Sequence, residues 1–102
     1  MTNCVFCKIL NGEIPSKIIY QDDCCFAIND INPKAKKHIL VIPKEHIESL
    51  NEIKDFTLMK NMFEAIKKIN LQENISHFKT QINTGAAAGQ EVMHLHIHIL
   101  AN

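Results

Sequence analysis

The most reactive feature of this sequence is a run of three alternating histidines close to its last residue. His94, His96 and His98 occupy every second position within GQEVMHLHIHILAN, residues 89–102. Because side chains alternate between the two faces of a β-strand, the three imidazoles are expected to share one face while apolar residues occupy the other. At a spacing of roughly 7 Å along the strand they would line the floor of a groove without packing against each other.

A loop of small residues lies directly before these histidines, at residues 85–89 with the sequence GAAAG. Residues without bulk would let a phosphate group approach free backbone N–H groups, with Asn83, Gly89 and Gln90 at the same place. Taken alone, such a loop is more often a flexible connector. Next to an imidazole it indicates nucleophilic catalysis at phosphorus, which needs mainly positioning and charge neutralisation.

Two pairs of cysteines have different interpretations. Cys4 and Cys7 form a C-x-x-C motif, which is moderate evidence for metal or redox chemistry. The alternative is a pair of buried thiols. Cys24 and Cys25 are adjacent, so a disulfide between them would be strained, and we interpret them as ordinary strand residues with a redox role as the lesser alternative.

Length, composition and charge bound the class of protein. The 102 residues predict a single domain over 1–102, and eleven basic residues balance eleven acidic ones. A neutral chain argues against a nucleic-acid partner, although it allows one small phosphate ligand. With neither an apolar run of about 18 residues nor a signal peptide, we expect a cytoplasmic protein that does not bind membranes, with its cysteines as thiols or metal ligands.

The elements that must position these residues follow from hydrophobic periodicity and turn signals. A long helix over about 55–70, with Asp55 as a plausible N-cap, would present one apolar face made of Met59, Met62, Phe63, Ile66 and Ile69. The alternation of short apolar runs with turn residues predicts an α+β fold. Its other expected elements are a short helix at 4–10, a hairpin over 17–30, strands at 38–43, 77–83 and 92–100, and a helical turn at 44–50.

Taken together, the motifs resemble one family. HLHIHIL matches the pattern H-φ-H-φ-H-φ-φ, where φ is apolar, at every position. The stretches CVFCKILNGEIPSKIIYQDD, FAINDINPKAKKHILVIPKEHI and INTGAAAGQEVMHLHIHIL extend the similarity over nearly the whole chain. The sequence is similar to the histidine triad (HIT) superfamily, and within it to the Hint-like branch of purine nucleoside phosphoramidases. This resemblance implies a HIT-like fold with about five antiparallel strands, one long and one short helix, and a homodimer whose sheet is continuous.

The resemblance also implies a role for individual residues. His96 would attack the α-phosphate and form a nucleotidyl-histidine intermediate, from which water releases the nucleoside monophosphate. Residues implied to support the reaction or bind phosphate are His38, Asn83, Gly89, Gln90, His94 and His98. Residues implied to bind the nucleoside are Phe6, Ile9, Phe26, Asp30 and Ile31, where the carboxylate of Asp30 suits the two ribose hydroxyls.

A zinc site is implied in the same way. Some family members with this C-x-x-C motif bind zinc through both cysteines and two histidines, which here are Cys4, Cys7, His46 and His94. Two cysteines and two histidines form a closed tetrahedral set, which suits a structural ion. The alternative is that the cysteines are buried thiols and His46 is a surface residue.

We therefore expect a nucleoside phosphoramidase-like hydrolase that acts on purine nucleotides. A dinucleoside polyphosphate hydrolase is the near alternative. A nucleotide-binding regulatory module without catalysis, or a zinc-structured interaction protein, would belong to a different class. Two departures from the family leave the leaving group open: position 91 is Glu where other members have Ser or Thr, and the sequence ends at Asn102 without a Gly-Gly-Arg-like tail.

Overall fold

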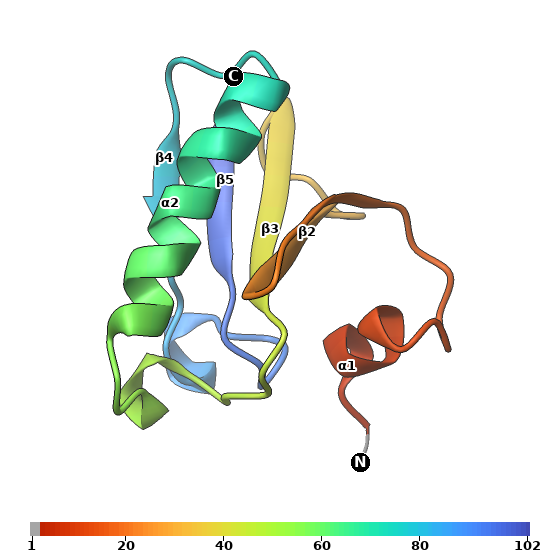
Figure 1. The fold of residues 1–102 in the computed structure, drawn as a ribbon, viewed down its shortest axis with the longest axis vertical. Helices are drawn as coiled ribbons and strands as arrows, with labels where there is room; N and C mark the ends of the chain where they lie inside the picture. The colour runs from red at the N-terminus through yellow and green to blue at the C-terminus, as the bar shows by residue number, and fades with distance from the viewer. Residues whose placement is uncertain (1–2) are drawn as a thin grey trace.

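The computed structural model describes residues 3–102 as one antiparallel sheet with a helix on each side (Figure 1). The strand order is β1-β2-β3-β5-β4, and none of the helices in the described part is long and apolar enough to cross a membrane. The α+β class, the five strands, and the long and short helices are confirmed. The strands are β1 Ile18–Gln21, β2 Cys25–Asn29, β3 Lys37–Pro43, β4 Lys79–Gln81 and β5 Ile97–Ala101.

The two faces of the sheet bury two separate apolar clusters, because alternate residues of each strand point in opposite directions. One face packs on helix α2, Thr57–Gln72, which runs across the strands in Figure 1. The other face packs on the short helix α1, Val5–Leu10. Strand residues buried towards α2 are Cys25, Ala27, Ile39, Val41, Ile97 and Ile99, whereas those towards α1 are Phe26, Ile28, Leu40 and Ile42.

The long helix begins two residues later than expected. The Asp55 side chain accepts a hydrogen bond from the backbone N–H of Thr57 at 3.0 Å, so it does satisfy one of the free donors at the helix start. The predicted apolar face is buried at Met59, Met62, Ile66 and Ile69. The prediction is wrong for Phe63, which is 42% exposed, while Ala65 takes its place in the core.

Helix α1 is only six residues long, so its conformation depends on tertiary contacts. The sulfur of Cys4 accepts a hydrogen bond from the N–H of Cys7 (3.4 Å), which caps the helix, and Phe6 and Ile9 are buried against the sheet. The hairpin behind it is fixed by Asp22, whose carboxylate accepts from the N–H groups of Cys24 (2.7 Å) and Cys25 (2.9 Å). Cys25 is a buried strand residue, as we interpreted it.

Two expected elements differ in the structure. Residues 44–49 are not helical, because the carbonyl of Ile47 accepts from Leu95 N–H (2.7 Å) and that of Glu48 accepts from the Gln90 side chain (2.6 Å). The last strand begins at Ile97 and not at Val92. In the register that pairs Val41 with Ile97, Leu95 would lie opposite Pro43 two positions further on, and Pro43 has no N–H to donate.

Candidate active site

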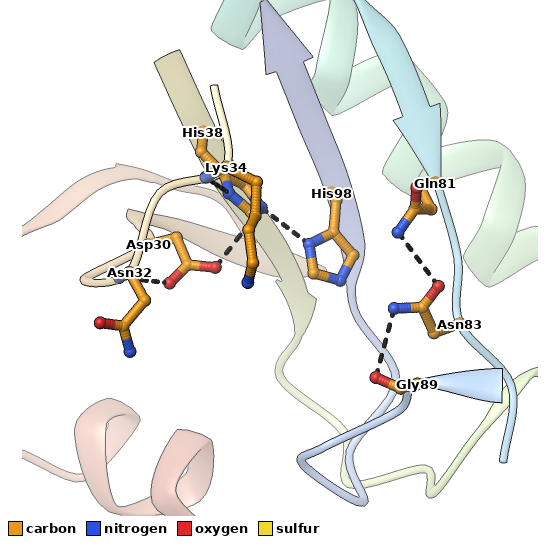
Figure 2. A network of polar contacts seen from close by, with 8 residues as sticks. All are labelled: Asp30, Asn32, Lys34, His38, Gln81, Asn83, Gly89 and His98. Atoms are coloured by element: carbon orange, nitrogen blue, oxygen red, sulfur yellow. Dashed lines mark hydrogen bonds and ion pairs between the residues drawn. The ribbon is translucent and has the colours of Figure 1, made fainter. Parts of the chain in front are cut away.

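His38 and His98 lie on neighbouring strands, on the sheet face opposite α2. The Nε2 atom of His38 is 2.8 Å from Nδ1 of His98, and the backbone N–H of Lys34 donates to Nδ1 of His38 at 3.0 Å (Figure 2). Since Nδ1 of His38 is an acceptor, its proton is on Nε2 and is donated to His98. His98 must then carry its own proton on Nε2, a buried atom with no partner among the described residues. The site therefore presents one hydrogen-bond donor ready for an anion.

His96 is held in the complementary state. Its Nδ1 lies 2.7 Å from the carbonyl oxygen of His94, so this nitrogen carries the proton and donates it. The Nε2 atom is left with a free lone pair on a residue that is 7% exposed. The prediction that the imidazoles do not pack together is wrong, because the centroids of the His96 and His98 rings are 4.9 Å apart. A free imidazole lone pair and a hydrogen-bond donor are thereby side by side.

His94 does not face the groove with the other two. It is fully buried, and its Nε2 donates to the carbonyl oxygen of Pro43 at 2.8 Å. The lone pair on Nδ1 is therefore directed towards the sulfurs of Cys4 (3.2 Å) and Cys7 (3.6 Å) and towards Nδ1 of His46 (3.1 Å).

These four residues could hold a metal ion. The four donor atoms lie within 4.8 Å of one another, and Nδ1 of His46 is 3.4 Å from the Cys7 sulfur. Around a tetrahedral zinc with bonds of about 2.0–2.3 Å, ligand atoms are separated by about 3.3–3.8 Å. The spacing and the free lone pair of His94 both fit such an ion. The structure thus brings together the four residues that the sequence resemblance implied as its ligands.

Burial keeps the site histidines neutral. It is the main cause that lowers the pKa of His96, which the nearby Asp30 and Glu91 carboxylates partly oppose. Burial likewise lowers the pKa of His98 to about 4, with His96 and His38 adding to the decrease. The pKa of His38 is also lowered by burial, against the effect of Asp30. At neutral pH the lone pair of His96 is therefore available for attack.

A cavity of about 350 Å³ opens in front of His96 and His98. Of the residues implied to bind the nucleoside, Phe6, Ile9, Asp30 and Ile31 line this cavity. Phe26 does not, because its side chain is completely buried in the cluster beneath. The carboxylate of Asp30 accepts from Asn32 N–H at 2.9 Å and lies 3.4 Å from Nε2 of His38.

The small-residue loop is more closed than its composition suggests. The backbone N–H groups of Gly85, Ala88, Gly89 and Gln90 are already bonded within the loop, so most of its donors are not free as we expected. The buried Gln90 amide accepts from Gly85 N–H and donates to the carbonyls of Glu48 and Val92. Asn83 donates to the Gly89 carbonyl at 3.4 Å (Figure 2). Both amides shape the loop, and their direct contact with phosphate stays a prediction.

Lys34 is a charged residue of this site that the sequence analysis did not single out. Its side chain extends past the His38 ring, on the side where His98 and Asp30 converge (Figure 2). Its positive charge contributes to the lowered pKa of His38 and of His98. The available signal was the basic loop KAKK directly before His38.

Comparison with known proteins identifies the class to which this fold and site belong. Residues 3–102 match the family described as scavenger mRNA decapping enzyme C-term binding. Protein HitA of Neisseria gonorrhoeae is 44% identical over 98% of this chain and 96% of its own. An uncharacterised HIT-like protein of Methanocaldococcus jannaschii is 43% identical over 95% of this chain and 77% of its own.

Similar solved structures are also histidine triad proteins. A histidine triad protein from Clostridium difficile has a TM-score of 0.94 at 45% identity, and a HIT family hydrolase from Clostridium thermocellum has 0.96 at 42% identity. Both alignments cover 100% of this chain and 92% of the other. The chain belongs to the histidine triad family.

Proposed function

We propose that this protein is a hydrolase of purine nucleotides that cleaves P–N bonds at the α-phosphate through a nucleotidyl intermediate on His96. The observation that carries the proposal is the position of the ring protons on two histidines, His96 and His98, that line one cavity. His96 is neutral with a free Nε2 lone pair, and His98 presents a buried N–H without a partner. A nucleophile and a fixed donor for the developing charge are the two parts that nucleotidyl transfer requires.

The geometry supports a two-step reaction. The Nε2 lone pair of His96 attacks phosphorus, the P–N bond breaks, and the leaving amine takes a proton from solvent. The His98 N–H donates to a non-bridging phosphate oxygen, and His38 holds His98 in the required tautomer. Water then attacks phosphorus, the bond to His96 breaks, and nucleoside monophosphate leaves. Asp30 would accept hydrogen bonds from the ribose hydroxyls, with Phe6 and Ile9 as the apolar wall beside the base.

AMP release from adenosine 5′-phosphoramidate tests this function. Wild-type protein should release AMP, and His96→Ala should abolish release above background. His77→Ala is the matched control, because His77 is an exposed histidine away from the cavity. Release that persists in His96→Ala would remove the proposed nucleophile. A wild type that binds AMP by calorimetry but releases none would instead be a nucleotide-binding module.

We also infer that the ion held by Cys4, Cys7, His46 and His94 is zinc. The two sulfurs and two imidazole nitrogens form the donor set that zinc favours in structural sites. When bound, zinc would supply a link between α1 and the segment that enters β5, with no role in the reaction. Ligation by thiolates requires reduced cysteines, which suits the cytoplasmic location expected from the sequence.

A homodimer would extend the sheet across its β4 edge. Strand β4 pairs only with β5 among the described residues, and all three of its residues are exposed. Phe78, directly before β4, and Phe63 on α2 are each 42% exposed. An unpaired strand edge with exposed aromatic side chains is a surface suited to pairing with a second copy.

A further inference from the structure

The cavity of about 350 Å³ in front of His96 and His98, called the nucleotide cavity from here on, is lined by charges that are unusual for a site that binds phosphate. Its ionisable lining residues are the carboxylates of Asp30 and Glu91 and the imidazoles of His96 and His98. None of its lining residues within 3–102 is a lysine, and the sequence contains no arginine. Asp30 has the ribose as its expected partner, whereas the proposed reaction leaves Glu91 without one.

Glu91 lies where two cavities meet. It lines the nucleotide cavity with His96 and His98, and it also lines a second cavity of about 670 Å³. Val5 and Val92 are likewise common to both, so the two cavities share one wall. Glu48 is the only other carboxylate on the second cavity, and no lysine of the described residues lines it. Cys4, Cys7 and His46 of the metal cluster also line this cavity. A group leaving the phosphorus towards this cavity would therefore pass carboxylates.

Lys34, a lysine beside His38 and His98, is not among the residues that line the nucleotide cavity with Glu91. The charge of Lys34 acts on His38 and His98, whereas that of Glu91 acts on His96. Figure 2 shows the Lys34 side chain beside His38, between Asp30 and His98. Lys34 and His98 can thus meet the non-bridging oxygens, while Glu91 is left for the group that departs.

We propose that Glu91 selects the leaving group by its charge, favouring a neutral or cationic amine over phosphate or polyphosphate. This inference rests on the proposed function and deepens it. As the P–N bond breaks, the electron pair stays on nitrogen, which takes a proton from solvent and leaves as the amine. The carboxylate of Glu91 accepts a hydrogen bond from that nitrogen, an interaction with a charged acceptor.

An anionic leaving group meets the opposite situation. Phosphate or polyphosphate would carry its charges past Glu91 into a cavity with a second carboxylate, Glu48. With no lysine or arginine to neutralise those charges, the repulsion raises the barrier for cleavage of a P–O–P bond. The same residue therefore disfavours the dinucleoside polyphosphate hydrolase that the sequence left open.

The test compares two substrates that share AMP and differ in the leaving group: N-propyl adenosine 5′-phosphoramidate, which releases propylamine, and ADP, which releases phosphate. The measured quantity is the ratio of their kcat/KM values, because effects on the common AMP portion cancel in it. Wild-type protein should prefer the phosphoramidate. Glu91→Gln, which keeps the size and removes the charge, should lower the ratio about tenfold, and Glu91→Lys should lower it further.

Glu64→Gln is the matched control, because Glu64 is an exposed carboxylate on α2, which packs on the other face of the sheet. Its ratio should stay within about twofold of wild type. A Glu91→Gln ratio equal to wild type, or a wild type that prefers ADP, would overturn the role of Glu91 and leave His96 as nucleophile. No AMP from either substrate would overturn the proposed function itself, and the role of Glu91 with it.

Discussion

The three histidines of the triad, His94, His96 and His98, differ in the hydrogen-bond partners of their two ring nitrogens. Backbone carbonyls accept hydrogen bonds from Nε2 of His94 and from Nδ1 of His96. The His38 ring donates to Nδ1 of His98 and so sets the tautomer of that ring. The remaining nitrogen of His94 directs a lone pair towards the cysteines, and that of His96 directs a lone pair into the cavity. The remaining nitrogen of His98 carries a proton that it can donate. Identical side chains thereby present three different hydrogen-bonding groups to their surroundings.

The lowered pKa of His96 predicts the pH dependence of the reaction. The proposed reaction requires His96 to be unprotonated, and burial keeps the pKa of His96 below the ordinary value of 6.5. The acid limb of the kcat/KM profile should therefore fall below pH 6.5. AMP release would be measured between pH 4 and 8, with correction for uncatalysed hydrolysis.

Glu91 provides an internal control for this profile. Its carboxylate opposes the decrease in the pKa of His96, so Glu91→Gln should move the acid limb to still lower pH. A wild-type limb at or above pH 6.5 would mean that His96 is not held neutral by burial.

At the scale of elements, the site depends on segments that have little regular structure of their own. His94 and His96 precede β5, the loop at 85–89 contains only a 3₁₀ turn at Ala86–Ala88, and α1 has six residues. Side-chain hydrogen bonds, not long helices or strands, therefore fix these segments. Gln90 connects the 85–89 loop, the segment at 44–49 and the segment that enters β5 through its single amide.

Loss of the Gln90 amide should destabilise the fold. Gln90→Ala leaves Gly85 N–H and the carbonyls of Glu48 and Val92 without this partner, and we expect a decrease of about 2–3 kcal/mol in the free energy of unfolding. Urea denaturation measures this value. Gln21→Ala, on an exposed residue at the end of β1, should change it by less than about 0.5 kcal/mol. Similar values for both variants would show that the loop is held by other contacts.

Removal of the metal should loosen α1. Because six residues cannot form a stable helix alone, chelation should lower the melting temperature by roughly 10 °C or more and speed amide exchange within Val5–Leu10. Cys7→Ser should show neither response, whereas Cys24→Ser, at a cysteine outside the cluster, should respond as wild type does.

Metal analysis of protein not exposed to chelator or nickel should find about one zinc per chain. A metal-free wild type would contradict the inference.

At the scale of the whole molecule, the exposed β4 edge predicts a dimer. Phe78→Glu would place a charge beside that edge and should give a monomer by light scattering, because burial of an unpaired charge is costly. Phe56→Glu is the control: Phe56 is 62% exposed directly before α2 and should tolerate the change. A wild-type monomer at micromolar concentration would contradict the proposed sheet extension.

The sequence predicted the parts of the molecule that depend on local pattern. Alternation and turn residues identified the hairpin and the central strand, and helical periodicity identified α2. The late start of β5 could not be predicted, because it depends on the register that would place Leu95 opposite Pro43. The burial of Phe26 and the approach of Lys34 to His38 also require the packed fold, since no local pattern encodes distance to another strand.

The identity of His96 as nucleophile is tested most directly by trapping its adduct. Wild-type protein would be mixed with adenosine 5′-phosphoramidate, quenched in alkali within one turnover, digested, and analysed by mass spectrometry. We expect the mass of one AMP moiety on the peptide that contains residues 94–98, located at His96. An adduct on His94 or His98, or turnover with no adduct at any histidine, would contradict it.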